Sequence, residues 1–486
     1  MNIKLSRRQV LTGAALAAAV GAAEGAGRNL SALASVTVGT PTRRTGGNAL
    51  VVLFLRGGAD GLNIVVPYAD DDYHRLRPTL GLAGPNDRGT DPKARVLDLD
   101  GFFGLHPAPA PLLPLYYAGA FAAVHAVGSG DQTRSHFEAM ATMERGLAQD
   151  TGAASGWLAR HLNATATEHD SPLRAVAVTD TMPDSLRGAI SATALSSLAD
   201  YRLTAPAVLP TGSDGQVYHA PSPAARADAL TDSLRGLYGE GNREQKGTGN
   251  REQGTGNRAE RGEREEGTEG KRQKAQYPTP NTQHPDFLSS AGSETLAALE
   301  AVHRLDPAHY RPVPGAVYPN NEIGNGFRQV ACLVKGDVGL EIACLDMGGW
   351  DTHVAQGRDT GWQPARLSDL GRALAAFAAD LGPLLARVTT VVMTEFGRRA
   401  YENSGLGTDH GRASCMFLLG GGVHGGRVFA QWPGLAEARL EGPGDLHVTT
   451  DYRDILAEIL AHRLHNPHLA DVFPEYTPRF HNLVRG

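Results

Sequence analysis

The chain has 486 residues, of which 41% are hydrophobic, and it carries a formal net charge of −6 at pH 7. This length and composition allow a sizeable core, and the slight acidity excludes a general nucleic-acid binder, whose binding surface is basic. The three cysteines, Cys332, Cys344 and Cys415, are too few and too scattered for a disulfide framework or a cysteine zinc site.

Residues 1–34 have the pattern of an export signal. A basic start is followed by the short apolar stretch 10–23, and residues 6–11 resemble the twin-arginine export motif. Residues 32–34 have the small-x-small pattern of a cleavage site, with alanines at 32 and 34. Because a membrane span takes about 20 apolar residues, we expect no stable span after cleavage. The mature protein is predicted to be periplasmic or secreted, exported by the twin-arginine route.

The rest of the chain alternates apolar and amphipathic runs. Strands are predicted at six nearly continuous apolar runs, residues 49–55, 121–127, 173–178, 338–345, 388–393 and 415–419. Helices are predicted between them, at residues 109–117, 136–147, 224–237, 293–304, 326–335 and 367–385. The alternation predicts an α/β fold with a doubly wound, mostly parallel sheet and helices on both faces. Ligands of such sheets bind beyond the carboxyl ends of the strands.

The loop after the first predicted strand contains Arg56 and Asp60 in a glycine-rich run. Glycines let backbone N–H groups approach an anion, and an aspartate offers a hard oxygen ligand to a metal ion. A glycine-rich turn with a solvated aspartate has the same pattern, so this loop alone leaves both interpretations open.

The loop after the second predicted strand contains Arg134 and Ser135, and Glu138 follows three residues later. Ser135 and Glu138 have the spacing of a capping box, which predicts the start of a helix. Because a helix N-terminus also binds anions, Ser135 is at the same time a candidate nucleophile with Arg134 beside it. The two interpretations are compatible.

Residues 239–285 form a repetitive, low-complexity segment that we do not expect to contribute to the hydrophobic core. It repeats the letters GNREQ at 241–245 and 249–253, mixes both charges and contains almost no large apolar side chain. Such a segment cannot bury enough surface to offset the entropy cost of ordering. We predict a disordered insertion in a single domain that spans residues 35–486.

Asp351 and His353 lie in the loop after the fourth predicted strand. An Asp-x-His pattern can offer a carboxylate and an imidazole to one metal ion. A turn with a surface histidine is the structural alternative.

Glu395 directly follows the fifth predicted strand, and Asp409 and His410 come after a short loop. A carboxylate that leaves a hydrophobic strand needs a cationic partner, which is either a metal ion or one of the arginines Arg398 and Arg399. The Asp-His pair fits a hydrogen-bonded turn as well as a metal site. Because all these loops are expected at one edge of one sheet, we predict a shared metal site.

Five segments resemble the domain-of-unknown-function 1501 family of exported bacterial proteins, namely residues 55–63, 134–137, 349–353, 394–398 and 407–411. That family is similar to the alkaline phosphatase/sulfatase superfamily. The resemblance implies an alkaline-phosphatase-like fold, two adjacent metal ions, usually zinc or manganese, and a serine, threonine or modified cysteine nucleophile. For this chain we expect one or two ions and a serine nucleophile.

The resemblance also implies roles for individual residues. Asp60 would bind one metal with Ser135 beside it, and Glu395 stands where the superfamily commonly has the Asp of an Asp-His pair. The other metal would be held by three residues, Asp351, His353 and His410.

Three departures from the superfamily pattern are visible. Phe396 replaces the histidine of the Asp-His pair and removes a ligand from the Asp60 metal. Asp351 and His353 are closer in sequence than is usual in the superfamily. The sulfatase signature Cys-x-Pro-x-Arg is absent, which argues against a formylglycine sulfatase.

The leading hypothesis is an exported metal-dependent hydrolase of phosphate or sulfate esters, small-molecule or envelope. Ser135 would attack the ester, while Arg134 and Arg56 stabilise the transferred group. The alternative from another class is a non-catalytic cell-envelope binding or assembly protein with a degenerate metal site, which Phe396 favours. A metal-free serine hydrolase is the third hypothesis, and the chain contains no Gly-x-Ser-x-Gly motif to support it.

Overall fold

The computed structural model describes residues 47–148, 154–167, 170–199 and 296–486. Apart from residues 296–299, these belong to one compact unit formed by residues 41–201 and 300–486. The predicted export signal (1–34), the predicted insertion (239–285) and the helix predicted at 224–237 lie outside the described residues. Within the described part, no helix has the length and apolar character that a membrane span requires.

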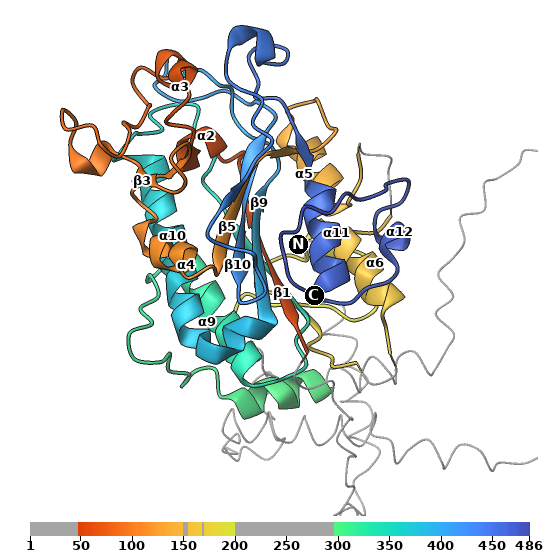
Figure 1. The fold of residues 1–486 in the computed structure, drawn as a ribbon. Helices are drawn as coiled ribbons and strands as arrows, with labels where there is room; N and C mark the ends of the chain where they lie inside the picture. Colours follow the sequence, from red (N-terminus) through yellow and green to blue (C-terminus); the bar gives the residue numbers. More distant parts are fainter. Residues whose placement is uncertain (1–46, 149–153, 168–169, 200–295) are drawn as a thin grey trace, which may run out of the picture. The chain divides into compact units, whose positions relative to one another are not determined.

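The centre of this unit is a nine-stranded mixed sheet (Figure 1). The strands lie in the order β11 (Val428–Phe429), β5 (Phe121–Gly128), β10 (Ser414–Gly420), β9 (Val388–Thr394), β1 (Ala49–Leu55), β8 (Ile342–Met347), β6 (Ala175–Ala177) and β7 (Thr193–Ala194), with β12 (Thr450–Asp451) paired to β5. β10 is antiparallel to both β9 and β5, and the other pairings of this sheet are parallel.

The prediction of an α/β fold with a mostly parallel sheet is confirmed at this level. All six predicted strands are present, although β6 is shorter than predicted and β8 begins only at Ile342. The strand predicted at 415–419 is expected to be parallel to its neighbours, but the observed strand β10 is antiparallel to them. Residues 395–413, which join β9 to β10, contain no crossover helix, and adjacent strands joined without a crossover run antiparallel.

Helices cover both faces of the sheet (Figure 1). One face carries α4 (Leu113–Tyr117), α9 (Glu322–Lys335) and α10 (Trp362–Leu381), and the other carries α5 (His136–Glu144), α6 (Trp157–Ala164), α11 (Tyr452–His462) and α12 (Leu469–Val472). α9 begins four residues before the predicted start, because the side chain of Asn321 caps it by accepting a hydrogen bond from Gly324 N.

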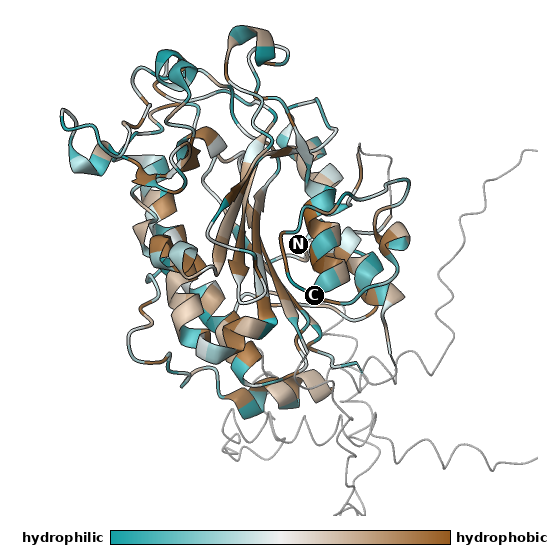
Figure 2. Ribbon diagram, in the orientation of Figure 1, coloured by the Kyte–Doolittle hydropathy of each residue, from teal (hydrophilic) through white to brown (hydrophobic). Residues whose placement is uncertain are grey.

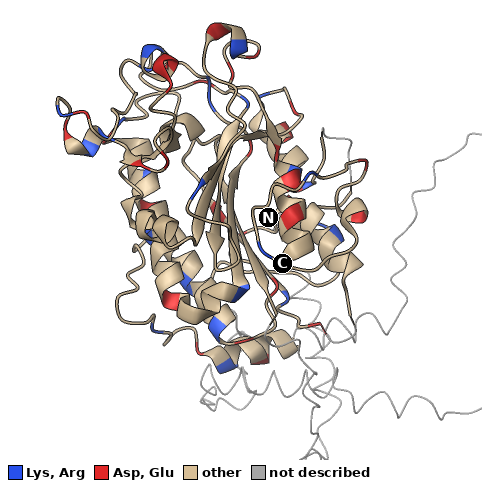
Figure 3. Cartoon of the chain, in the orientation of Figure 1, with Lys and Arg blue, Asp and Glu red and all other residues tan. Residues whose placement is uncertain are grey.

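The core lies where the helices meet the sheet. All seven residues of β1 are buried, and Leu50, Val52 and Phe54 pack in one cluster with Trp157 of α6 and Ile455 of α11. Figure 2 shows hydrophobic residues along the strands and on the sheet-facing sides of the helices. Figure 3 shows the charged residues mainly on loops and outer helix surfaces. A strand with helices on both faces buries every side chain, which explains the continuous apolar runs.

Short elements that the sequence analysis missed surround this framework. They include a three-stranded sheet of β2 (Val65–Val66), β4 (Gly104–Leu105) and β3 (Leu97–Asp98). Two short helices, α2 (Gly61–Ile64) and α3 (Asp71–Leu76), follow β1. The missed 3-10 helices of the described residues are η1 (Pro92–Ala94), η3 (Asp184–Leu186) and η7 (Glu437–Arg439). Two others, η2 (Ala110–Leu112) and η6 (Gly382–Arg387), overlap the helices predicted at 109–117 and 367–385.

One edge of the large sheet collects the loops that carry the candidate residues. The carboxyl ends of β1, β5, β8 and β9 lie at this edge, together with the amino end of the antiparallel β10. The loop before β10 therefore reaches the same edge as the loops after the other four strands.

Candidate metal centre

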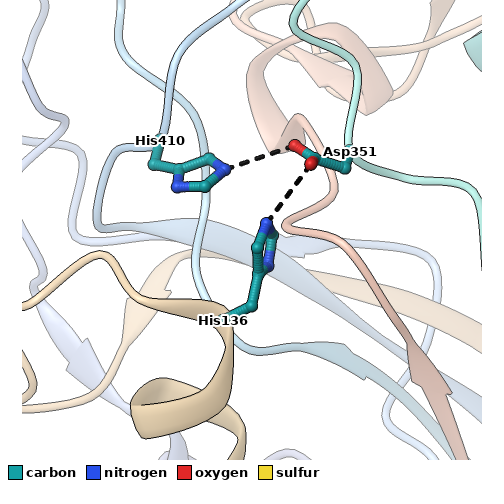
Figure 4. Close-up of side chains that lie close together, drawn as sticks. All are labelled: His136, Asp351 and His410. Atoms are coloured by element: carbon teal, nitrogen blue, oxygen red, sulfur yellow. Dashed lines mark hydrogen bonds and ion pairs between the residues drawn. The ribbon is translucent and has the colours of Figure 1, made fainter.

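Asp351, in the loop after β8, lies at the centre of a cluster of three histidines. Its Oδ1 atom is 3.2 Å from His410 Nε2 and 3.2 Å from His353 Nε2. Its Oδ2 atom is 3.5 Å from His136 Nε2. Figure 4 shows His136, at the start of helix α5, and His410, in the loop before β10, directed toward this carboxylate. One ligand atom from each of Asp351, His136 and His410 lies within 4.8 Å of the other two.

His410 is held by the backbone of the loop before α5. Its Nδ1 atom lies 2.9 Å from the carbonyl oxygen of Arg134. Because a carbonyl only accepts hydrogen bonds, Nδ1 carries the proton, and in the neutral ring Nε2 presents a lone pair to the cluster. Arg134 adopts a φ of 57°, a left-handed conformation. Burial and the charge of Arg398 lower the pKa of His410, which favours this neutral form.

His353 is oriented in the same way by a carboxylate. Its Nδ1 atom lies 3.1 Å from Asp409 Oδ1, which also accepts a hydrogen bond of 2.9 Å from the Asn403 amide. The bond from Asn403, then that from His353, lowers the pKa of Asp409 against the effect of burial. The proton of His353 is therefore on Nδ1, and its Nε2 atom lies 2.9 Å from His410 Nε2.

His136, the first residue of α5, has the third oriented imidazole. Its Nδ1 atom lies 2.7 Å from Oε1 of the buried Glu395. Glu395 is fixed by Gly57 N, which donates to Oε1, and by the Thr394 hydroxyl, which donates to Oε2. The bond to Glu395 raises the pKa of His136, with burial acting in the opposite direction. His136 Nε2 is buried and has no hydrogen-bond partner among the described residues.

The donor chemistry of the cluster fits a divalent cation. When both rings are neutral and carry their proton on Nδ1, His353 and His410 direct two lone pairs at each other and at the Asp351 carboxylate. Three imidazole nitrogen atoms and one carboxylate are ligands that zinc and related ions take in proteins. Each ring also donates its other N–H to a carboxylate or carbonyl, as ligating histidines almost always do.

Arg398 supplies positive charge beside this cluster and ties its loops together. Its guanidinium is buried and donates to Asp351 Oδ1 at 2.7 Å. Burial alone would raise the pKa of Asp351, but the hydrogen bond and charge of Arg398 outweigh it and lower the pKa to about 2. Arg398 also donates to four backbone carbonyls, those of Gly57, Gly58, Trp350 and Thr408.

Gly57 and Phe396 shape the immediate surroundings. Gly57 has a φ of 124°, and a Cβ atom there would lie 2.5 Å from Asp351 N, so the loops after β1 and β8 approach as closely as they do because residue 57 is glycine. The Phe396 ring packs against His136 and His410, with ring centroids 4.9 and 4.8 Å apart. Phe396 therefore forms an apolar wall of the cluster.

The structure brings together five of the six residues predicted as metal ligands. Asp351, His353 and His410 present atoms to the centre of the cluster, whereas Glu395 and Asp409 contact it through the Nδ1 atoms of the histidines. Arg398 pairs with Asp351 rather than with Glu395.

Asp60 has other partners. Arg77 donates to its two oxygens at 2.6 and 2.9 Å, and Gln356 donates to Oδ2 at 2.7 Å. Asp60 and Arg77 are both fully buried. Asp60 therefore belongs to a buried ion pair next to the site.

The two arginines predicted to stabilise the transferred group also form ion pairs of their own. Arg56 pairs with Glu144 at 2.9 Å and with Asp346 at 2.8 Å. The guanidinium of Arg134 pairs with the buried carboxylate of Asp445.

Ser135 occupies the N-cap position of α5 and immediately precedes His136. Its side chain makes no capping hydrogen bond within the described part of the chain, so the predicted capping box does not form. The Ser135 hydroxyl is therefore not used to cap the helix.

His136 is the cluster residue that the sequence analysis did not assign to the metal. The available signal was its place in the loop after a buried strand, the same place that identified Asp351 and Glu395.

Residues 323–470 match a protein family described as "Protein of unknown function (DUF1501)". The matched region contains Asp351, His353, Glu395, Asp409 and His410, and it supports the family resemblance found in the motifs. No curated protein and no solved structure matches the chain.

Proposed function

We propose that this protein is an exported, metal-dependent hydrolase of phosphate or sulfate esters with an alkaline-phosphatase-like α/β fold. The observation that carries the proposal is the convergence of His353 Nε2, His410 Nε2 and Asp351 Oδ1, with separations of 2.9 to 3.2 Å. They meet at the sheet edge where open α/β folds bind ligands. Export rests on the sequence pattern of residues 1–34.

Asp351, His353 and His410 would hold a divalent ion, for which we expect zinc or manganese. Bound there, the ion would act as a Lewis acid that neutralises charge on the transferred phosphoryl or sulfuryl group. The Arg398 guanidinium, 2.7 Å from Asp351 Oδ1, adds fixed positive charge. Arg56 forms ion pairs with Glu144 and Asp346, and Arg134 forms one with Asp445. Because these carboxylates already neutralise both guanidinium groups, we assign the two arginine side chains no catalytic role.

Ser135 is the proposed nucleophile. It lies at the N-terminus of the nine-residue helix α5, where unpaired backbone N–H groups favour an anion. Its oxygen bonds to phosphorus or sulfur while the ester oxygen leaves with a proton as the alcohol. Water then hydrolyses this serine ester, which restores the hydroxyl and releases phosphate or sulfate.

The test combines metal analysis with a screen of phosphate monoesters, phosphate diesters and sulfate esters. Ser135→Ala is expected to lower turnover on the order of 1,000-fold while the bound metal stays unchanged. Ser368→Ala, on helix α10, is the matched control and should behave as wild type. Undiminished turnover by the Ser135 variant would rule out the nucleophile assignment.

A non-catalytic envelope protein is the second candidate. The Asp60–Arg77 pair favours it, because a carboxylate expected to bind a second metal is neutralised by a guanidinium instead. This candidate predicts that the purified protein turns over no ester in the screen, whether or not metal is bound.

A further inference from the structure

The proposed hydrolysis gives no role to His136, although its Nε2 atom points into the cluster. This atom is buried without a hydrogen-bond partner among the described residues, and it lies 3.5 Å from Asp351 Oδ2. A contact of this length satisfies the nitrogen only as an ion pair of the protonated ring. A metal ion bound by the nitrogen lone pair and shared with Asp351 would take the place of that proton.

The three imidazole rings of the cluster are oriented in the same way. Each has its Nδ1 atom within 3.1 Å of an acceptor, and each directs Nε2 toward Asp351. The acceptors for His136, His353 and His410 are, in order, Glu395, Asp409 and the Arg134 carbonyl. Each imidazole is therefore oriented by a group from a different segment of the chain than its own.

Glu395 lies outside the ligand set, because its oxygen atoms are occupied by donors. Oε1 accepts hydrogen bonds from His136 Nδ1 and Gly57 N, and Oε2 accepts one from the Thr394 hydroxyl. Asp409 Oδ1 similarly accepts from His353 Nδ1 and the Asn403 amide. Both carboxylates therefore contact the cluster through the Nδ1 atoms of histidines.

Asp60 is excluded by its own partners. Both oxygens accept hydrogen bonds from Arg77, and Gln356 adds a further one. The Arg77 side chain is fully buried, so its guanidinium already neutralises the Asp60 carboxylate.

We propose that the cluster binds a single ion per chain through the Nε2 atoms of His136, His353 and His410 and the carboxylate of Asp351. This inference rests on the proposed metal dependence and specifies its ligands. The nitrogen-rich donor set favours Zn²⁺, Fe²⁺, Co²⁺ and Ni²⁺ over Mg²⁺ and Ca²⁺, which prefer oxygen ligands.

The coordination number of the bound metal ion shows whether the proposed site can also catalyse hydrolysis. Four protein ligands complete a tetrahedral zinc site of the structural kind, whereas a catalytic site keeps or gains a further position. An ion with this ligand set that keeps or gains a fifth position is compatible with hydrolysis, and an ion that stays four-coordinate is not.

The test uses the full-length protein, stripped of metal with a chelator and titrated with Co²⁺. Visible absorption reports binding and coordination number, and mass spectrometry of the metal gives the stoichiometry. The wild type is expected to bind one Co²⁺ per chain. Glu395→Gln should weaken binding about 10- to 100-fold, as loss of an orienting partner does, and His136→Gln should weaken it more. His309→Gln, at an exposed histidine outside the cluster, should leave binding unchanged.

Two ions per chain, or unchanged Co²⁺ affinity in a folded His136→Gln protein, would overturn the inference while leaving a metal-dependent hydrolase possible. One ion with the expected dependence on His136 but no ester turnover would support the inference and contradict the hydrolase. A wild-type protein that binds no Co²⁺ would overturn both. If His136→Gln does not fold, the stoichiometry and spectrum of the wild type and of Glu395→Gln decide between these outcomes.

Discussion

The Nε2 atoms of His353 and His410 lie 2.9 Å apart, and the other nitrogen of each ring is already committed to an oxygen acceptor. Two neutral imidazoles arranged in this way repel each other through their lone pairs, whereas a proton or a metal ion at these nitrogen atoms makes the contact favourable. This arrangement of the two rings is stabilised when a cation lies between them and the nearby Asp351 carboxylate. It is the physical basis of the metal-dependent function proposed for this protein.

Removal of the central carboxylate should abolish tight metal binding. Asp351→Asn keeps the shape of the side chain but removes the charge that faces all three histidines. We expect the affinity for Co²⁺ or Zn²⁺ to fall on the order of 100-fold or more, measured by competition with a chelator. Asp359→Asn, at a carboxylate paired with Arg358, is the control. Equal affinity of the Asp351 variant and wild type would contradict the assignment.

Loss of Arg398 should destabilise the fold as well as the site. Arg398→Met leaves the carbonyls of Gly57, Gly58, Trp350 and Thr408 without their donor. Unsatisfied buried acceptors cost about 1–3 kcal/mol each, and relaxation reduces the sum, so we expect a loss of about 3 kcal/mol or more in the free energy of unfolding in urea. Arg372→Met, at a half-exposed ion pair, should cost less than about 1 kcal/mol. Similar losses in both variants would refute the role of Arg398.

Asp60 should matter for stability and not for metal affinity. Asp60→Asn leaves the fully buried Arg77 guanidinium without its charge partner, which typically costs about 3–5 kcal/mol. The folded fraction of this variant should still bind one ion with wild-type affinity, measured by Co²⁺ titration below its unfolding temperature. A lower stoichiometry than wild type would show that Asp60 is a ligand after all.

The free energy of unfolding should decrease at acidic pH, because protonation of Glu341 weakens its buried contacts. Burial would raise the pKa of this carboxyl, but hydrogen bonds from His161 and Arg174 outweigh it and lower the pKa from 4.5 to about 2. A lowered folded-state pKa means that the contribution is complete above the unfolded value and is lost as the pH falls from about 4.5 toward 2. The shift corresponds to about 3 kcal/mol.

The measurement is the free energy of unfolding of wild type and Glu341→Gln in urea between pH 7 and pH 3. The variant should be less stable at pH 7, and the difference from wild type should shrink as the pH falls. Glu437→Gln, at an exposed glutamate, should keep the wild-type pH dependence. A constant difference between wild type and the Glu341 variant would disprove this account.

The sequence predicted the sheet because long buried strands leave continuous apolar runs, and β1 coincides with its prediction. It also predicted which loops carry the site, since parallel strands end at the same edge. The direction of β10 depends on the missing crossover helix between β9 and β10, which an apolar run alone does not report. Short strands such as β2 and β7 have too few residues to produce a pattern.

The roles of individual site residues were harder to predict than their location. Asp60 and Arg77 lie 17 positions apart, and no local pattern shows that a guanidinium rather than a metal meets the carboxylate. Glu395 and His136 lie 259 positions apart, so their hydrogen bond follows only from the packing of α5 against the end of β9. Whether a carboxylate binds a metal or orients a histidine depends on such contacts.

The most direct measurement is an anomalous difference map, collected at the zinc absorption edge from crystals of the zinc-loaded protein. The account predicts one peak per chain, with the Nε2 atoms of His136, His353 and His410 and an oxygen of Asp351 about 2.0–2.2 Å from it. A peak beside Asp60, or no peak among the three histidines, would contradict it.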